Sequence, residues 1–196
     1  KYLNKKKKPL DLIPQIQNSI RPPYLSTFDT HTMDAINLSV YHTDAESISL
    51  SENFPEKTVS FLLETSSGLK VKKDFTFYYD RYQVDFDLNI TDRNGNLADK
   101  KFYVNWGHGL GNENIKGKKQ QRYFIGPMSY LNNQAIKHKA DDIQREFVFS
   151  GNLSWVCLQN KYFASALIPQ NGINTGRISK NPDDKFSVGL QLINNS

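Results

Sequence analysis

Residues 82–91 alternate strictly between apolar and polar side chains, and no other segment constrains the fold of this chain as strongly. The apolar positions are Tyr82, Val84, Phe86, Leu88 and Ile90, and the polar positions are Gln83, Asp85, Asp87, Asn89 and Thr91. A repeat of two residues is that of a β-strand, whose successive side chains point to opposite faces of a sheet. The segment therefore predicts a half-buried strand in an antiparallel sheet, with one face on the core and one in solvent.

Short strand-like segments separated by turn signals fill most of the remaining chain. Strands are predicted at residues 58–64, 69–77, 102–106, 147–149 and 186–192, with shorter alternations at 36–40 and 48–50. Turns are predicted at 66–68, 79–81 and 94–95, and loops at 9–26, 107–117 and 171–184. Residues 132–145 are the best candidate for a helix or a further loop. Many short strands with little helix predict an all-β fold of the sandwich type.

Residues 151–169 concentrate aromatic side chains between two short apolar runs. The runs at 156–158 and 164–168 predict two buried strands joined by a tight turn that carries Tyr162 and Phe163. The two tryptophans, Trp106 and Trp155, lie in apolar surroundings, and we expect their rings to pack in the core.

The length and composition fit one globular domain with a sizeable core, since the chain has 196 residues of which 38% are hydrophobic. Its apolar runs are far shorter than the roughly 20 residues needed to cross a bilayer. The chain opens at Lys1 without a methionine, so we expect a piece of a longer protein. Cys157 is the only cysteine, which excludes a disulfide within the chain, and its apolar neighbours predict a buried, unreactive thiol.

The formal net charge is +5, which leaves the class of partner open. Lysines gather at residues 5–8, at 70, 72 and 73, and at 116, 118 and 119. We interpret these groups as solvated loops and strand faces, with attraction to an anionic lipid surface as the alternative. Nucleic acid is not expected as a partner, because basic and aromatic residues do not interleave as a stacking platform requires.

No pattern of residues indicates catalysis, a cofactor or a metal, so the chain is not expected to be an enzyme. The glycine-rich residues 107–111 lack the helix and the Lys-Ser or Lys-Thr pair of a phosphate loop. The four histidines, His31, His42, His108 and His138, do not fall at metal-ligand spacing, and no Gly-x-Ser-x-Gly elbow is present. Asp80, Asp85 and Asp87 form the best carboxylate group. They are interpreted as a charged solvent face, and alternatively as half of a carbohydrate or calcium site.

Four blocks in order along the chain resemble the large periplasmic domain of the YidC family of bacterial membrane protein insertases. The first covers residues 1–14 and ends in Pro9-Leu10-Asp11-Leu12-Ile13-Pro14. The second is the hairpin region at 58–91, with Lys73-Asp74-Phe75 and then Tyr82-Gln83-Val84. The third is Asn105-Trp106-Gly107-His108-Gly109-Leu110, with His108 where the family commonly has proline. The fourth and most specific is the Trp155 to Pro169 block.

The resemblance implies a β-supersandwich of antiparallel sheets, similar in architecture to galactose-mutarotase-like sugar-binding domains. It implies one periplasmic domain over residues 1–196, lacking a first strand and belonging to a longer protein of the bacterial inner membrane. The family-motif residues, with a structural or partner-binding role, are Trp106, Gly107, Gly109, Trp155, Tyr162, Phe163 and Pro169.

The implied function is non-catalytic support of membrane-protein insertion and folding. The implied partners are the Sec translocon components SecD–SecF and SecYEG, and nascent membrane proteins. A carbohydrate-binding or mutarotase-like sandwich that uses the three aspartates and His108 is the alternative from another class, and a purely structural spacer is a third.

Overall fold

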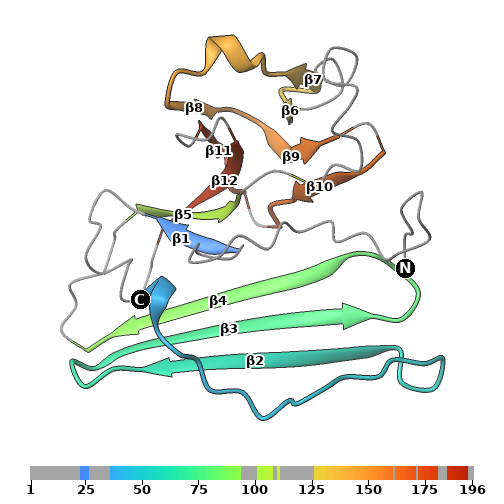
Figure 1. Ribbon diagram of the computed structural model, residues 1–196, viewed down its shortest axis with the longest axis vertical. Helices are drawn as coiled ribbons and strands as arrows, with labels where there is room; N and C mark the ends of the chain where they lie inside the picture. The colour runs from blue at the N-terminus through green and yellow to red at the C-terminus, as the bar shows by residue number, and fades with distance from the viewer. Residues whose placement is uncertain are drawn as a thin grey trace. The chain divides into compact units, whose positions relative to one another are not determined.

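The computed structural model describes residues 23–26, 36–93, 101–107, 110, 126–160, 162–170, 172–180 and 185–193. These residues form antiparallel sheets with very little helix, so the predicted all-β class is confirmed (Figure 1). The chain divides into two compact units: Lys1–Phe28 with Phe102–Leu192, and Asp29–Lys101 with Ile193–Ser196. A single domain over residues 1–196 stays a prediction.

The second unit is built on a three-stranded antiparallel meander. Its strands are β2 (Glu56–Glu64), β3 (Leu69–Tyr78) and β4 (Val84–Asp92), paired in that order. The predicted turn at 66–68 is confirmed, because Gly68 has a left-handed backbone (φ +87°) and its N–H donates to the carbonyl of Thr65 at 3.0 Å. The predicted strands at 58–64 and 69–77 are confirmed with extensions of a residue or two.

The register of this meander separates its apolar side chains from its polar ones. Pairs such as Val71 with Ile90 and Phe75 with Phe86 place one apolar set on one face. That set is Val59, Phe61, Leu63, Leu69, Val71, Phe75, Phe77, Val84, Phe86, Leu88 and Ile90, with Lys73 among them. The rings of Phe61, Phe75 and Phe86 form a chain of contacts with centroids 5.7 and 4.9 Å apart.

The alternation that opens at Tyr82 extends beyond the strand it predicted. Strand β4 begins only at Val84, and Tyr82 is 94% exposed, so its predicted place on the buried face is wrong. The last pair of the β3–β4 ladder is Phe77 with Val84, and residues 79–83, which include the predicted turn at 79–81, connect the two strands. Within it, the guanidinium of Arg81 lies over the ring of Tyr78 at 4.1 Å.

Two short alternations before the meander do not form strands. Residues 36–38 are helical, with Ile36 fully buried and both Leu38 and Val40 exposed. Three apolar residues at a spacing of two are too few to distinguish a strand from a helical turn. Residues 48–50 also lie outside any strand, whereas His42 forms an isolated antiparallel bridge with Leu62 through two 2.8 Å backbone hydrogen bonds.

The first unit packs two antiparallel sheets against each other. The five-stranded sheet has the order β1 (Tyr24–Ser26), β5 (Lys101–Trp106), β12 (Phe186–Ile193), β11 (Thr175–Lys180) and β8 (Glu146–Ser150). The four-stranded sheet has the order β10 (Ala164–Leu167), β9 (Leu153–Gln159), β6 (Gly126–Leu131) and β7 (Gln134–Lys137).

Buried side chains of both sheets form one hydrophobic core, which confirms a β-sandwich in this unit. Its members are Ile143, Phe149, Leu153, Val156, Leu158, Ile178, Val188 and Leu190. Removing so much apolar surface from water is the main stabilising contribution, at about 25 cal/mol per Å². The finer likeness to galactose-mutarotase-like domains stays a prediction.

Several predictions in this unit need correction. The predicted loop at 171–184 contains β11, and the predicted loop at 9–26 contains β1. Residues 132–145 hold β7 and a 3₁₀ turn (Ala140–Asp142) rather than a helix. The strands predicted at 102–106, 147–149 and 186–192 are confirmed as β5, β8 and β12. The predicted turn at 94–95 lies outside the described residues.

The β6–β7 hairpin was not foreseen, although a local signal exists. Its two-residue turn is Asn132-Asn133, and both residues have positive φ angles of 52° and 64°. Such a turn matches the twist of the flanking strands, and asparagine tolerates the left-handed conformation better than most residues.

Candidate interaction surface

The hairpin of β9 and β10 carries three of the family-motif residues, Trp155, Tyr162 and Phe163, and one side chain holds its turn. The Oδ1 atom of Asn160 accepts hydrogen bonds from the backbone N–H groups of Tyr162 and Phe163 at 2.9 and 2.8 Å. The N–H of Asn160 donates to the carbonyl of Phe163 at 2.8 Å. The predicted strand–turn–strand is therefore confirmed, but only β9 is buried, because β10 is the outer strand of its sheet.

Trp155 lies on the outer face of the four-stranded sheet, not in the core. Its neighbours Val156 and Leu158 belong to the core, and alternation turns Trp155 and Cys157 to the opposite face. There the half-buried Trp155 ring packs against Tyr130, its cross-strand partner, with centroids 5.9 Å apart. The prediction that Trp155 packs in the core is wrong.

The other motif residues lie at separate points. Trp106 is half-buried against the core, and Gly107 is buried. Tyr162 is 63% exposed at the hairpin turn, roughly 17 Å of extended strand from Trp155, so these two rings do not form one site. Phe163 and Pro169 are half-buried, and Gly109 and His108 lie outside the described residues.

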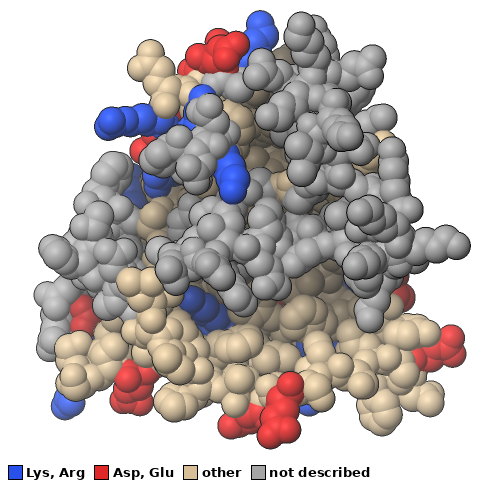
Figure 2. All heavy atoms as spheres, in the orientation of Figure 1, with Lys and Arg blue, Asp and Glu red and all other residues tan. Residues whose placement is uncertain are grey.

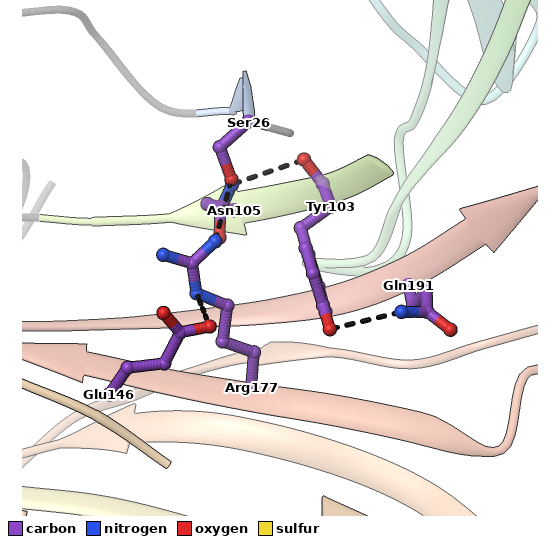
Figure 3. Close-up of polar contacts among 6 residues, drawn as sticks. All are labelled: Ser26, Tyr103, Asn105, Glu146, Arg177 and Gln191. Atoms are coloured by element: carbon purple, nitrogen blue, oxygen red, sulfur yellow. Dashed lines mark hydrogen bonds and ion pairs between the residues drawn. The ribbon is translucent and has the colours of Figure 1, made fainter. Parts of the chain in front are cut away.

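A polar cluster that sequence reasoning missed crosses the face of the five-stranded sheet opposite the core (Figure 3). Its centre is Arg177 on β11, whose Nη1 donates to Ser26 Oγ at 3.0 Å and whose Nε lies 3.0 Å from Glu146 Oε1. The N–H of that Nε is not directed at an acceptor, so the contact with Glu146 is an ion pair without a hydrogen bond. The guanidinium also lies 5.0 Å from the centre of the Tyr103 ring.

The cluster links all five strands of this sheet through side chains. The amide of Asn105 donates to Ser26 Oγ at 2.8 Å and to the carbonyl of Tyr103 at 3.1 Å, and Gln191 Nε2 donates to Tyr103 Oη at 3.0 Å. Asn105 and Tyr103 are buried. Gly189 leaves the space for Asn105, because a Cβ there would lie 2.5 Å from Asn105 Oδ1. The arrangement fastens β1, β5, β12, β11 and β8 together, and it gives hydrogen-bond partners to Asn105 and Tyr103, whose polar groups would be costly to bury alone.

The three aspartates of the carboxylate group are all on or beside the meander of the second unit. Asp85 accepts a hydrogen bond from Tyr78 Oη, and a second one from Gln83 Nε2 at 2.6 Å. Both bonds lower the pKa of Asp85 below its usual value, and the bond from Tyr78 has the larger effect. Asp80 pairs with the adjacent Arg81, and Asp87 lies on the polar face opposite Asp74. No group of three His, Cys, Asp or Glu residues within the described ranges is arranged to hold a metal ion. Sugar binding stays a prediction, which calorimetry at millimolar ligand tests.

His138 and Ser129 form a hydrogen-bonded pair at 2.9 Å between Nε2 and Oγ. The ring of His138 stacks on Phe149 with centroids 5.3 Å apart, and burial lowers its pKa, so it is neutral at pH 7. A serine beside a neutral histidine is the start of a nucleophilic pair. Ser129 is, however, 0% exposed, so a substrate cannot reach its hydroxyl, and the pair serves packing.

Of the lysines predicted to be solvated, Lys73 is half-buried on the apolar face of the meander. Its Nζ lies 4.2 Å from the centre of the Tyr41 ring, and burial lowers the pKa of Lys73 to about 8 and raises that of Tyr41 to about 12. Lys70 and Lys72 are exposed and pair with Glu64 and Asp74 at 2.8 and 2.7 Å. On the face drawn in Figure 2, acidic and basic side chains of the described residues lie close together at the top and are scattered among uncharged ones along the lower edge.

Cys157 is buried, as predicted, and burial raises the pKa of its thiol. A raised pKa leaves little thiolate at neutral pH, which agrees with an unreactive role. None of the helices among the described residues is long and apolar enough to cross a membrane.

Comparison with known proteins decides the family. The family model for the YidC periplasmic domain matches residues 1–193 of this chain. The chain belongs to the YidC periplasmic domain family. The "Membrane protein insertase YidC" of Chlorobaculum tepidum is 26% identical over 172 residues, which cover 87% of this YidC periplasmic domain and 29% of that protein. The protein of the same name from Syntrophus aciditrophicus is 20% identical over 185 residues, which cover 94% and 33%.

This YidC periplasmic domain therefore spans a third or less of the length of the curated relatives it matches. The family resemblance seen in the four sequence blocks is confirmed over almost the whole chain. Three of the blocks fall at least partly on described residues: the β2–β4 meander, the end of β5 and the β9–β10 hairpin.

Proposed function

We propose that this chain is the non-catalytic interaction domain of a YidC-type insertase, on the periplasmic side of the bacterial inner membrane. The family match over residues 1–193 carries the proposal. The partners proposed are nascent membrane proteins and the Sec components SecD–SecF and SecYEG. The exposed ring of Tyr162 supports a contact at the β9–β10 turn, because tyrosine supplies a large amphipathic surface at low entropic cost.

Fractionation of source cells tests the membrane setting. An antibody to this chain is expected to detect a band well above 22.5 kDa that resists carbonate extraction. The epitope should become sensitive to protease when the outer membrane is opened. A freely soluble band near 22.5 kDa would contradict the proposal.

Site-specific photocrosslinking in native membranes tests the partner. A benzoylphenylalanine at Tyr162 keeps an aromatic ring at this exposed turn, and the matched control carries the same residue at Asn89, an exposed position on the polar face of β4. Adducts at Tyr162 are expected to contain a Sec component or a membrane protein during insertion, identified by mass spectrometry. Adducts equal at both positions, or absent at Tyr162, would leave the chain as a structural spacer.

Contact with anionic lipid is a second element of the proposal, and it depends on residues 5–8 and 116–119, which lie outside the described ranges. Replacing Lys6 and Lys7 by Glu is expected to weaken binding to phosphatidylglycerol vesicles and to leave folding unchanged. Equal vesicle binding by both chains would remove the lipid from the proposal.

A further inference from the structure

The outer strand β8 leaves a row of backbone groups that pair with no other strand among the described residues. Backbone hydrogen bonds join Gly151 to Asn174 at 2.9 Å and Lys180 to Arg145 at 2.8 Å, which fixes the phase of the β8–β11 ladder. Bonded pairs recur every second residue in antiparallel strands, so Phe147 and Phe149 bond to β11. The N–H and C=O groups of the alternate residues therefore point away from the sheet, and these residues are Glu146, Val148 and Ser150.

The other outer strands of the described sheets are shorter or protected. Strands β1, β7 and β10 have three or four residues, and β7 ends in Lys137. His42 bridges the free side of β2, and β4 has further contacts at Ile90 and Asp92. Natural proteins protect sheet edges with prolines, lysines, bulges or covering segments. The sequence of β8, Glu-Phe-Val-Phe-Ser, contains no proline or lysine, and no bulge interrupts its pairing with β11.

The side chains of β8 define the chemistry of a strand that would pair with it. Phe147 is 41% exposed and Val148 is 46% exposed, and they lie on opposite faces of the sheet. Phe147 continues a row of rings, with centroids 5.4 Å from His138 and 5.7 Å from Phe149. A neighbouring strand would place its own side chains beside both residues, so it needs apolar side chains on both faces.

We propose that β8 binds an extended, continuously apolar polypeptide segment as a sixth strand of this sheet. Main-chain hydrogen bonds to residues 146, 148 and 150 would supply affinity that does not depend on the sequence of the bound segment. Contacts with Phe147 and Val148 would favour segments with apolar side chains. A membrane-spanning segment that has not yet become helical has this chemistry. The inference rests on the proposed function and names the form in which the partner binds.

Binding of a synthetic peptide to the 196-residue chain tests the inference. The probe is a fluorescent peptide of valine, isoleucine and phenylalanine flanked by lysines, with every second amide N-methylated so that one edge stays free and the peptide cannot form fibrils. The control peptide carries N-methyl groups on both edges. Saturable binding of the probe alone is expected, with slowed hydrogen exchange at the amides of residues 146, 148 and 150. Equal binding of the two peptides would overturn the proposal.

A proline variant locates the site. Val148→Pro removes an outward N–H and no bond to β11, whereas the control Val148→Thr keeps that N–H and a β-branched side chain. Val148→Pro is expected to weaken probe binding about tenfold or more, and Val148→Thr to leave it within about threefold. Equal binding by both variants would overturn the proposal. If Val148→Pro does not fold, the two peptides still decide the question on the unaltered chain.

The remaining outcomes are also decisive. Dimers of the chain that form with rising concentration and disappear in Val148→Pro, without peptide binding, would assign β8 to a second copy and overturn the proposal. Failure of peptide binding together with partner adducts at Tyr162 would refute this inference and leave the proposed function intact. Peptide binding without any adduct in membranes would support this inference and contradict the proposed function.

Discussion

Lys73 places an ammonium group in the middle of an otherwise apolar sheet face, and the Tyr41 ring compensates only part of its lost hydration. The pKa of Lys73 is lowered from the usual 10.5 to about 8. This shift shows that the cost of burying the ammonium outweighs its attraction to the Tyr41 ring. The folded chain therefore bears a cost for keeping this residue charged at neutral pH.

Replacing Lys73 by methionine is expected to stabilise the fold by about 1–2 kcal/mol at pH 7, after allowance for the solvent that still reaches the ammonium. Methionine keeps the length of the side chain without the charge. Urea unfolding measures the gain. Lys72→Met, on the exposed polar face, is the matched control and should change stability by less than about 0.5 kcal/mol. A destabilised Lys73→Met would show that the contact with Tyr41 is worth more than the burial costs.

The lowered pKa of Lys73 predicts that the stability of the fold depends on pH. Between pH 8 and 10.5 the unfolded chain holds a proton on Lys73 that the folded chain has released, so stability from this group rises with pH. The advantage of Lys73→Met should therefore be full below pH 8 and shrink toward zero near pH 10.5. Comparing the two chains at each pH cancels the other titrating groups. A constant difference across that range would contradict the assigned cause.

Trp155 and Val156 are neighbours with opposite surroundings, and this gives a sharp comparison. Trp155→Ala should cost about 1–2 kcal/mol, because its half-buried ring loses mainly the contact with Tyr130. Val156→Ala removes fewer atoms, yet it should cost about 2–3 kcal/mol because it opens a cavity in the core. Chemical denaturation of the two variants measures both values. A larger loss for Trp155→Ala would mean that its ring is enclosed.

At the scale of elements, the Asn132-Asn133 turn is open to improvement by one substitution. Asn133→Gly should stabilise the chain by roughly 0.5 kcal/mol, since glycine adopts a positive φ without steric cost. Asn133→Ala should destabilise it by about 1 kcal/mol. Asn132 is left unchanged because its Oδ1 accepts from the N–H of Asn152 at 2.9 Å. Thermal denaturation should show melting temperatures that move in opposite directions.

Elements were predictable where the apolar alternation runs long. Strands β3 and β4 followed from it because every second residue packs on one face. Strand β11 was missed because Gly176 interrupts its pattern, and Gly176 is there for packing, since a Cβ would lie 2.5 Å from the Phe149 ring. The polar cluster around Arg177 could not be predicted from the sequence, because its residues come from segments that are far apart in the chain and meet only in the folded sheet.

At the scale of the whole molecule, the question is whether the two units unfold together in one cooperative transition. Both tryptophans belong to the first unit, so their fluorescence reports on that unit, while circular dichroism reports on all strands. If the chain folds as one domain, the two signals should show coincident urea transitions. Lys73→Met, in the second unit, should then shift the tryptophan transition as well. An unshifted tryptophan transition would mean that the units unfold independently.

The hydrogen bond between Arg177 and Ser26 also limits how early the five-stranded sheet can be completed while the chain is synthesised. It joins residues 151 positions apart, and Asn105, the other donor to Ser26, is 79 positions away. At bacterial elongation rates of about 5–20 residues per second, Ser26 waits roughly 8–30 s after its own synthesis for Arg177 to be made. Strand β1 can pair with β5 once residues 101–106 have been made, whereas the contact of Ser26 with Arg177 must wait for β11. Within this chain, the five-stranded sheet can therefore be completed only after β11 and β12 have been made.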